Sequence, residues 1–130
     1  MSTTDQIHHP TSLSALQTLF STHTYVLLDF TATWCGPCKS ISPIFAQLAK
    51  SYSVPSLLAF AKVDVDAAQD IARQYGVSAM PTFMAFKEGK LVAVNGKREI
   101  RGADVRSLTA AAEKLGGLAK KRLEEREGKA

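Results

Sequence analysis

Two short apolar segments separated by an amphipathic stretch constrain the fold of this chain more than any other feature. Residues 25–30 are apolar except for Asp29, and residues 57–65 form a second, mainly apolar segment. Two buried strands joined by a helix make a β-α-β unit, which is most simply parallel. Pro43 lies inside the helical pattern and is expected to kink that helix. The intervening apolar residues recur at helical spacing, namely Ile41, Ile44, Phe45, Leu48 and Ala49.

The flanking segments predict further elements around this unit. Their hydrophobic spacing and their glycine, serine and aspartate positions set the expected boundaries. The predicted elements are a helix over 12–20 capped by Thr11 or Ser12, a helix around 67–75 ended by Gly76, and strands over 82–87 and 91–94 separated by a Glu88–Gly89 turn.

The last predicted helix begins at Asp104, a favourable capping residue, and ends at the Gly116–Gly117 pair. Its apolar face carries Val105, Leu108, Ala112 and Leu115. The residues that follow are mostly charged, and only two of them are leucines. We therefore predict one domain over residues 1–116 and a charged extension over 117–130, which forms a frayed helix and not part of the core.

Composition and length agree with a single globular domain. The chain has 130 residues, of which 45% are hydrophobic and 22% are charged. The longest apolar run, over 57–61, is too short to cross a bilayer, so no membrane span is expected. Residues 1–10 lack the basic and apolar regions of a signal peptide. Together with the two cysteines, too few for a secreted disulfide scaffold, this predicts a cytoplasmic protein.

Positive charge is concentrated in the last third of the chain. Residues 1–86 hold four basic and five acidic side chains, whereas residues 87–130 hold twelve basic and seven acidic ones. A basic segment of this kind could contact nucleic acid or an anionic membrane. The acidic side chains interleaved among the basic ones, and the lack of aromatic residues between them, favour a solvated helix surface instead. Neither nucleic acid nor membrane is expected as a partner.

The pair Cys35 and Cys38 follows the first predicted strand directly, in the sequence C-G-P-C. At the start of a helix, unpaired N–H groups and the positive end of the helix dipole stabilise a thiolate. Cys35 would lie at that position and gain nucleophilicity, and Cys38 would lie one turn further on, close enough to form a disulfide with it. Pro37 suits the first helical turn. This arrangement predicts thiol–disulfide chemistry.

A zinc site and a structural disulfide are the alternatives for this cysteine pair. Tetrahedral zinc needs four ligands, and the remaining ones would have to be histidines or carboxylates, none of which has a recognisable ligand spacing. No metal site is therefore expected. So short a loop would constrain the unfolded chain only slightly, which argues against a structural cross-link.

The segment from Asp29 to Lys39 resembles the active-site segment of thioredoxin, and Met80-Pro81-Thr82-Phe83 resembles the second signature of that family. The order of predicted helices and strands agrees with the family over about residues 7–115. The resemblance implies an α/β thioredoxin fold, with a central mixed β-sheet flanked by helices on both faces. It also implies a thiol–disulfide oxidoreductase that reduces protein disulfides.

The resemblance assigns roles to individual residues. Cys35 resembles the attacking thiolate, and Cys38 the thiol that resolves the mixed disulfide. Pro81 matches a proline whose preceding peptide bond is cis in the family, which would let the backbone of Met80 pair with an extended substrate segment. The implied substrate-binding residues are Trp34, Gly36, Pro37, Met80, Pro81 and Gly102.

Asp29 matches a buried acid behind the second cysteine, and Lys62 a lysine near that acid. A buried carboxylate costs free energy unless it has a partner, so Asp29 points to a functional role. Burial should raise the pKa of Asp29, and an approaching Lys62 should lower it. The alternative for Lys62 is an ordinary surface lysine. Trp34 and Phe83 could instead be aromatic residues of the core, and for Phe83 we favour this interpretation. The acidic residues at 64, 66 and 70 are expected to be solvated, and His8, His9 and His23 to lie on the surface.

The implied partners are disulfide-containing substrate proteins and an NADPH-dependent thioredoxin reductase that returns electrons, with no cofactor bound by this chain. A different kind of function is an interaction module that binds partners through the Met80–Pro81 groove with little redox turnover.

Two departures from the family are visible. Twelve residues lie between Gly89 and Gly102, more than is typical, and Asn95–Gly96 inside them predicts an additional turn in a longer or bulged hairpin. The extension after Gly116 is the second departure.

Overall fold

A computed structural model of the chain describes residues 7–128. The signal-peptide interpretation rests partly on residues 1–6, which lie outside this range. The predicted domain and its extension likewise include residues 1–6 and 129–130, of which the structure says nothing. No helix between residues 7 and 128 has both the length and the apolar character that a bilayer span requires.

A mixed sheet forms the centre of the molecule, with its strands in the order β1-β3-β2-β4-β5 and with β6 also paired to β4. The parallel pairing of β2 with β3 confirms the predicted β-α-β unit, and it places Asp29 opposite Lys62. Strand β4 is antiparallel to β2. The strands are β1 (Ile7–His8), β2 (Tyr25–Thr31), β3 (Leu58–Asp64), β4 (Thr82–Lys87), β5 (Lys90–Val92) and β6 (Ile100–Arg101).

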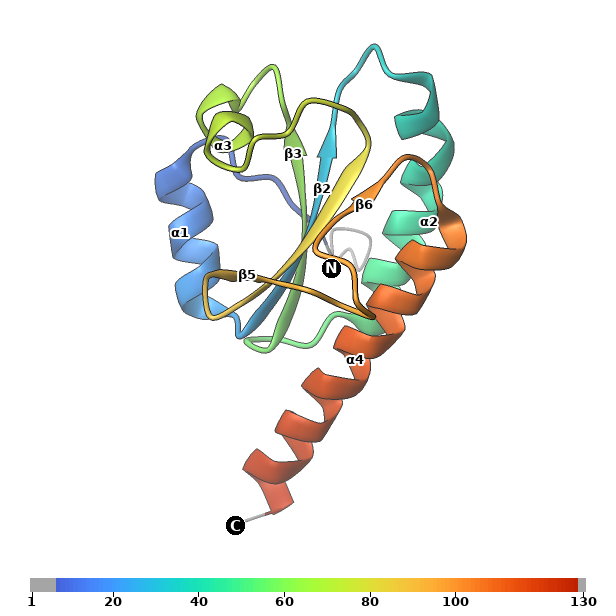
Figure 1. Ribbon diagram of the computed structural model, residues 1–130. Coiled ribbons are helices and arrows are strands. Elements are labelled where there is room, and N and C mark those ends of the chain that lie inside the picture. Colours follow the sequence, from blue (N-terminus) through green and yellow to red (C-terminus); the bar gives the residue numbers. More distant parts are fainter. Residues whose placement is uncertain (1–6, 129–130) are drawn as a thin grey trace, which may run out of the picture.

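Helices cover both faces of this sheet, which confirms the predicted fold class. Helices α1 and α3 lie on one face, and α2 and α4 lie on the other (Figure 1). Ser12 caps the first helix by accepting from the Ala15 N–H at 3.1 Å, and Asp104 accepts from the Ser107 N–H at 3.0 Å before the last helix. The helices are α1 (Leu13–Thr22), α2 (Gly36–Tyr52), α3 (Gln69–Gln74) and α4 (Val105–Gly128). Helix α2 continues through Pro43.

Two hydrophobic cores result from the alternation of side chains along β2. Leu27 packs in the core on the α2 and α4 side, whereas Val26 and Leu28 pack in the core on the α1 and α3 side. Asp29 is two residues from Leu27 on the same strand, so its side chain lies on the face that α2 covers. Phe83 is buried in the first core, as expected.

The predicted end of the last helix at Gly116–Gly117 is wrong, because α4 continues to Gly128. Gly116 is buried against α2, and a Cβ atom at this position would lie 2.6 Å from Cδ1 of Tyr52. This glycine therefore permits two helices to approach closely and does not stop a helix. Beyond it, Ala119 is fully buried, and Leu118 and Leu123 pack against the first core.

Charged side chains of the α4 extension also contact the body of the protein. The Arg122 guanidinium lies 5.9 Å from the centre of the Tyr25 ring, and Arg126 Nη1 donates to Ser56 Oγ at 3.3 Å. The prediction of a frayed helix that lacks core contacts is therefore wrong for residues 117–128. Whether these residues act as a separable extension of the domain stays a prediction.

The predicted additional turn between Gly89 and Gly102 is present. Asn95 and Gly96 both have positive φ values, and the backbone of Val94 exchanges two hydrogen bonds with that of Lys97. Strand β5 ends at Val92, two residues earlier than predicted. Residues 93–99 thus interrupt the edge of the sheet, since β5 and β6 both pair with β4.

Candidate active site

The two cysteines form a disulfide where β2 leads into α2, with their Cα atoms 5.3 Å apart. Cys35 is the N-cap residue of α2, and its Sγ accepts from the Cys38 N–H at 3.2 Å. Pro37 occupies the first turn of the helix, as predicted. The N–H group that contacts Cys35 Sγ in the disulfide is positioned to stabilise a thiolate on the same atom after reduction.

Both sulfur-bearing side chains are buried in the oxidised protein, with exposed fractions of 5% for Cys35 and 3% for Cys38. The expected greater accessibility of Cys35 concerns the reduced protein, so it stays a prediction. Residues 7–128 contain no group of three or more potential metal ligands that could hold an ion. Within that range nothing supports the zinc alternative.

A loop that includes the second signature lies against the cysteine pair. The Met80–Pro81 peptide bond is cis, in agreement with the expectation from the family. The carbonyl oxygen of Met80 lies 3.6 Å from Cys35 Sγ, and the Met80 side chain packs against the two cysteines. Gly102 borders this loop, with a φ of 85° and an N–H that donates to the Pro81 carbonyl at 2.8 Å. The structure therefore brings Cys35, Met80, Pro81 and Gly102 together.

Trp34 lies on the surface next to the cysteine pair, with an exposed fraction of 67%. Its indole Nε1–H donates to Asp66 Oδ2 at 2.9 Å. The core-aromatic alternative is thus wrong for Trp34. Sequence reasoning assigned Asp66 to a solvated edge and missed its contact with the indole, because no local pattern connects residues 34 and 66.

Asp29 is 1% exposed, and its Oδ1 has no hydrogen-bond partner among the residues that the structure describes. Burial raises the pKa of Asp29 from 3.8 to about 7, and the opposing effect of the Lys62 charge is smaller. These directions agree with both predicted effects on this carboxyl group. At neutral pH the carboxyl is therefore close to half-ionised and able to accept or to release a proton.

Lys62 lies on β3 opposite Asp29 and is half-buried. Its ammonium group donates a hydrogen bond to Ser42 Oγ. Ser42 follows Cys38 by one helical turn, and Cys38, Ser42 and Lys62 all line a cavity of about 310 Å³. Sequence reasoning missed Ser42, although its four-residue spacing from Cys38 was a signal for a position on the same face of the helix.

Comparison with known proteins gives consistent matches. The thioredoxin family model matches residues 9–110. A thioredoxin-like protein of Fusarium culmorum is 63% identical over 117 residues, which cover 90% of this chain and 97% of that protein. A thioredoxin of Neurospora crassa is 56% identical, with 91% and 93% of the two chains covered. Among solved structures, a similar chain comes from a study of the thiol-resolving mechanism in a yeast mitochondrial 1-Cys peroxiredoxin via glutathione and thioredoxin systems. The two chains are 34% identical and align with a TM-score of 0.73, and the alignment covers 87% of the present chain and 99% of the solved one.

Proposed function

This chain belongs to the thioredoxin family and is a protein-disulfide reductase, and we propose that Cys35 attacks the substrate disulfide while Cys38 resolves the intermediate. The observation that carries this assignment is the position of Cys35 at the N-cap of α2, with the Cys38 N–H directed at its sulfur. Only the first cysteine of the pair receives this contact.

In the first step, the Cys35 thiolate attacks one sulfur of the substrate disulfide. The S–S bond of the substrate breaks, its other sulfur leaves as a thiolate that takes a proton from solvent, and a mixed disulfide joins Cys35 to the substrate. The helix N-terminus favours the reactive thiolate, which makes Cys35 a good nucleophile near neutral pH.

In the second step, Cys38 loses its proton and attacks Cys35, which releases the second substrate thiol and forms the Cys35–Cys38 disulfide. Asp29 is the proposed base that accepts the Cys38 proton, directly or through a water molecule. Its pKa of about 7 supports this role, because a base titrating near the working pH is both available and strong enough. Lys62 tunes this base by favouring its ionised form. The net reaction transfers two electrons from the protein dithiol to the substrate disulfide.

The substrate is proposed to bind across the surface around the disulfide. The exposed Trp34 ring offers an aromatic contact, the exposed Gly36 and Pro37 offer a surface without bulky side chains next to the disulfide, and the Met80 backbone offers hydrogen bonds to an extended segment. The half-buried Gly102, held to Pro81, forms the border of this surface.

The chain needs an external source of electrons to complete a cycle. Thioredoxins carry no bound cofactor, and we propose that an NADPH-dependent thioredoxin reductase reduces the Cys35–Cys38 disulfide. The proposed substrates are disulfide-containing proteins, and the similarity to a chain from a peroxiredoxin study makes peroxiredoxins reasonable candidates among them. We place this activity in the cytoplasm, where thiols are kept reduced.

The test is the reduction of insulin by dithiothreitol with catalytic amounts of this protein. The wild type should accelerate the reaction, Cys35→Ser should abolish the acceleration, and Cys38→Ser should accumulate a mixed disulfide with the substrate on mass spectrometry. Lys50→Gln, at the far end of α2, is the matched control and should behave as the wild type. An inactive wild type whose partners bind equally to the double cysteine variant would indicate the interaction module instead.

A further inference from the structure

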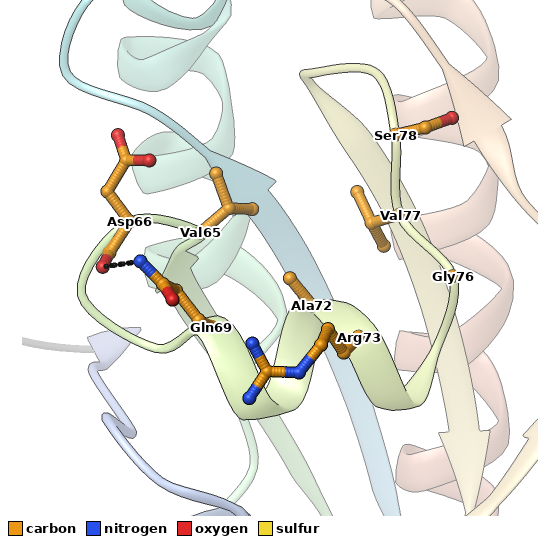
Figure 2. Close-up of a pocket in the computed structure, with 8 residues that line it drawn as sticks. All are labelled: Val65, Asp66, Gln69, Ala72, Arg73, Gly76, Val77 and Ser78. Carbon is orange, nitrogen blue, oxygen red and sulfur yellow. Dashed lines mark hydrogen bonds between the residues drawn. The ribbon is translucent and has the colours of Figure 1, made fainter.

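A cavity of about 590 Å³ lies between helix α3 and the loop that leads to Met80 (Figure 2). One wall comes from the end of β3 and from α3, and the other comes from the segment 76–78. Its apolar surface is contributed by Val65, Ala72 and Val77. The remaining lining residues are Asp66, Gln69, Arg73, Gly76 and Ser78.

Both walls of this cavity connect directly to the redox site. Asp66 on the first wall accepts the hydrogen bond from Trp34, the residue next to Cys35. On the second wall, Ser78 is two residues from Met80, whose carbonyl oxygen lies 3.6 Å from Cys35 Sγ. An extended segment that pairs with the Met80 backbone and continues along residues 78 and 77 therefore reaches the cavity.

The charges of the cavity are not equally available to a ligand. The Asp66 carboxylate is bound by the Trp34 indole, and Figure 2 shows it directed away from Arg73. Gln69 donates to the Asp66 carbonyl at 3.5 Å, and the nearby Asp70 accepts from the Leu13 N–H at 3.0 Å. Arg73 is exposed, and its guanidinium makes no hydrogen bond or ion pair with any of residues 7–128. Its guanidinium extends along α3 toward Gln69 at the cavity (Figure 2).

We propose that this cavity is a substrate subsite in which Arg73 binds an acidic side chain located a few residues from the cysteine under attack. The proposal rests on the function proposed above, and it adds a preference in substrate choice to that function. A guanidinium presents planar paired donors that match a carboxylate, and the apolar wall accommodates the methylene groups of a glutamate. Because the contact is exposed, it should change rates modestly and should depend on salt.

The test uses extended peptides with one cysteine in a mixed disulfide with 2-mercaptoethanol. Glutamate, glutamine or lysine is placed in turn at each position two to four residues from that cysteine, on either side. The second-order rate constant of reduction by the fully reduced protein is measured for each peptide. At one or more positions on one side of the cysteine, the wild type should reduce the glutamate peptide about threefold faster than the glutamine peptide. The advantage should shrink at high salt.

Variants at Arg73 decide whether this residue is responsible. In Arg73→Gln the ratio of the glutamate to the glutamine rate should fall to about one, Arg73→Lys should keep part of it, and Arg73→Glu should favour the lysine peptide. Lys50→Gln removes an equal charge far from the cavity and should keep the wild-type ratio. A wild-type ratio of one at every position, or an unchanged ratio in Arg73→Gln, would overturn the subsite.

Failure of the underlying function would look different. If the wild type reduced none of the peptides, or if Cys35→Ser reduced them at the wild-type rate, the proposed role of Cys35 would be wrong whatever the charge preference. The charge ratio and the dependence on Cys35 are thus separate readouts of the same assay.

Discussion

The two ends of the sheet differ in whether their residues supply chemistry or stabilise the fold. At the end where β2 leads into α2, a carboxyl group is buried with one oxygen that finds no hydrogen-bond partner between residues 7 and 128, and a disulfide lies beside a cis peptide bond. At the other end, the last turns of α4 extend past the sheet and contribute apolar packing and two arginine contacts (Figure 1). The buried carboxyl at the first end costs stability, and this end supplies the chemistry, whereas the second end adds contacts that stabilise the fold. Mutations at the two ends should therefore affect different measurements.

The largest expected effect is the pH dependence of stability that comes from Asp29. Its pKa is raised to about 7 in the folded protein, so the folded state holds a proton that the unfolded state has already lost above about pH 4. The contribution of this group to the free energy of unfolding therefore falls as pH rises from about 4 to 7, and is constant above that. Between pH 5 and pH 8 the loss should be about 3 kcal/mol.

Urea unfolding of the wild type and of Asp29→Asn at the two pH values measures this contribution. The amide has no proton to lose, so the variant should show less loss of stability with pH and should be the more stable protein at pH 8. Equal pH dependence in the two proteins would contradict the raised pKa of Asp29.

The same substitution should affect the kinetics at the redox end. Asp29→Asn removes the proposed base while it nearly preserves shape, so resolution of the mixed disulfide should slow by about 100-fold. Stopped-flow fluorescence of Trp34, with a preformed mixed disulfide, follows this step. In the wild type the rate should rise with pH through about 7, as Asp29 ionises. A resolution rate in Asp29→Asn that equals the wild type between pH 6 and 8 would leave Asp29 with a structural role only.

At the opposite end, two adjacent glycines of α4 provide a matched pair. Gly116→Ala places a Cβ 2.6 Å from the Tyr52 ring, so α2 and α4 must shift, and the cost should be about 2 kcal/mol. Gly117→Ala meets no atom within 4 Å and should stabilise the helix by up to about 1 kcal/mol. Thermal melting compares them, and insulin reduction should be unchanged in both. Equal melting temperatures would mean that the close helix contact is not needed.

Truncation after Gly117 should destabilise the protein less than Gly116→Ala. It removes the half-buried Leu118 and Leu123 and the buried Ala119, for an expected loss of about 1.5 kcal/mol. For a domain of this size that corresponds to a fall in melting temperature of about 6 °C. Disulfide reduction at 25 °C should not change. A truncated protein with the wild-type melting temperature would support the sequence-based interpretation that this segment is not part of the core.

The sequence predicted the redox end better than the opposite end, for a physical reason. The cysteine pair and Asp29 are recognisable from neighbours a few residues away, because helix capping and an acid in an apolar strand are local signals. The cis bond before Pro81 was implied by the resemblance of Met80-Pro81-Thr82-Phe83 to the second signature of the family. The structure agrees with the predicted cis bond and with the raised pKa of Asp29. The separate catalytic roles of the two cysteines stay predictions.

Contacts between distant segments could not be predicted in this way. Trp34 and Asp66 meet only because β2 and β3 are neighbours in the sheet, and Lys62 finds Ser42 because α2 packs on the same face. Gly116 was expected to end the helix because glycine commonly follows the last helical residue. Its actual role depends on Tyr52, in a different helix.

The interrupted edge of the sheet has a consequence for the behaviour of this protein in concentrated solution. Exposed strand edges are where other chains add strands and begin to aggregate. Here the outer strands β1 and β5 have two and three residues, and the turn at Asn95–Gly96 separates β5 from the two-residue β6. Between residues 7 and 128, a misfolded chain thus finds no long edge to extend. If substrates pair with the Met80 backbone as proposed, the protein can accept these extended segments without nucleating their aggregation along its sheet.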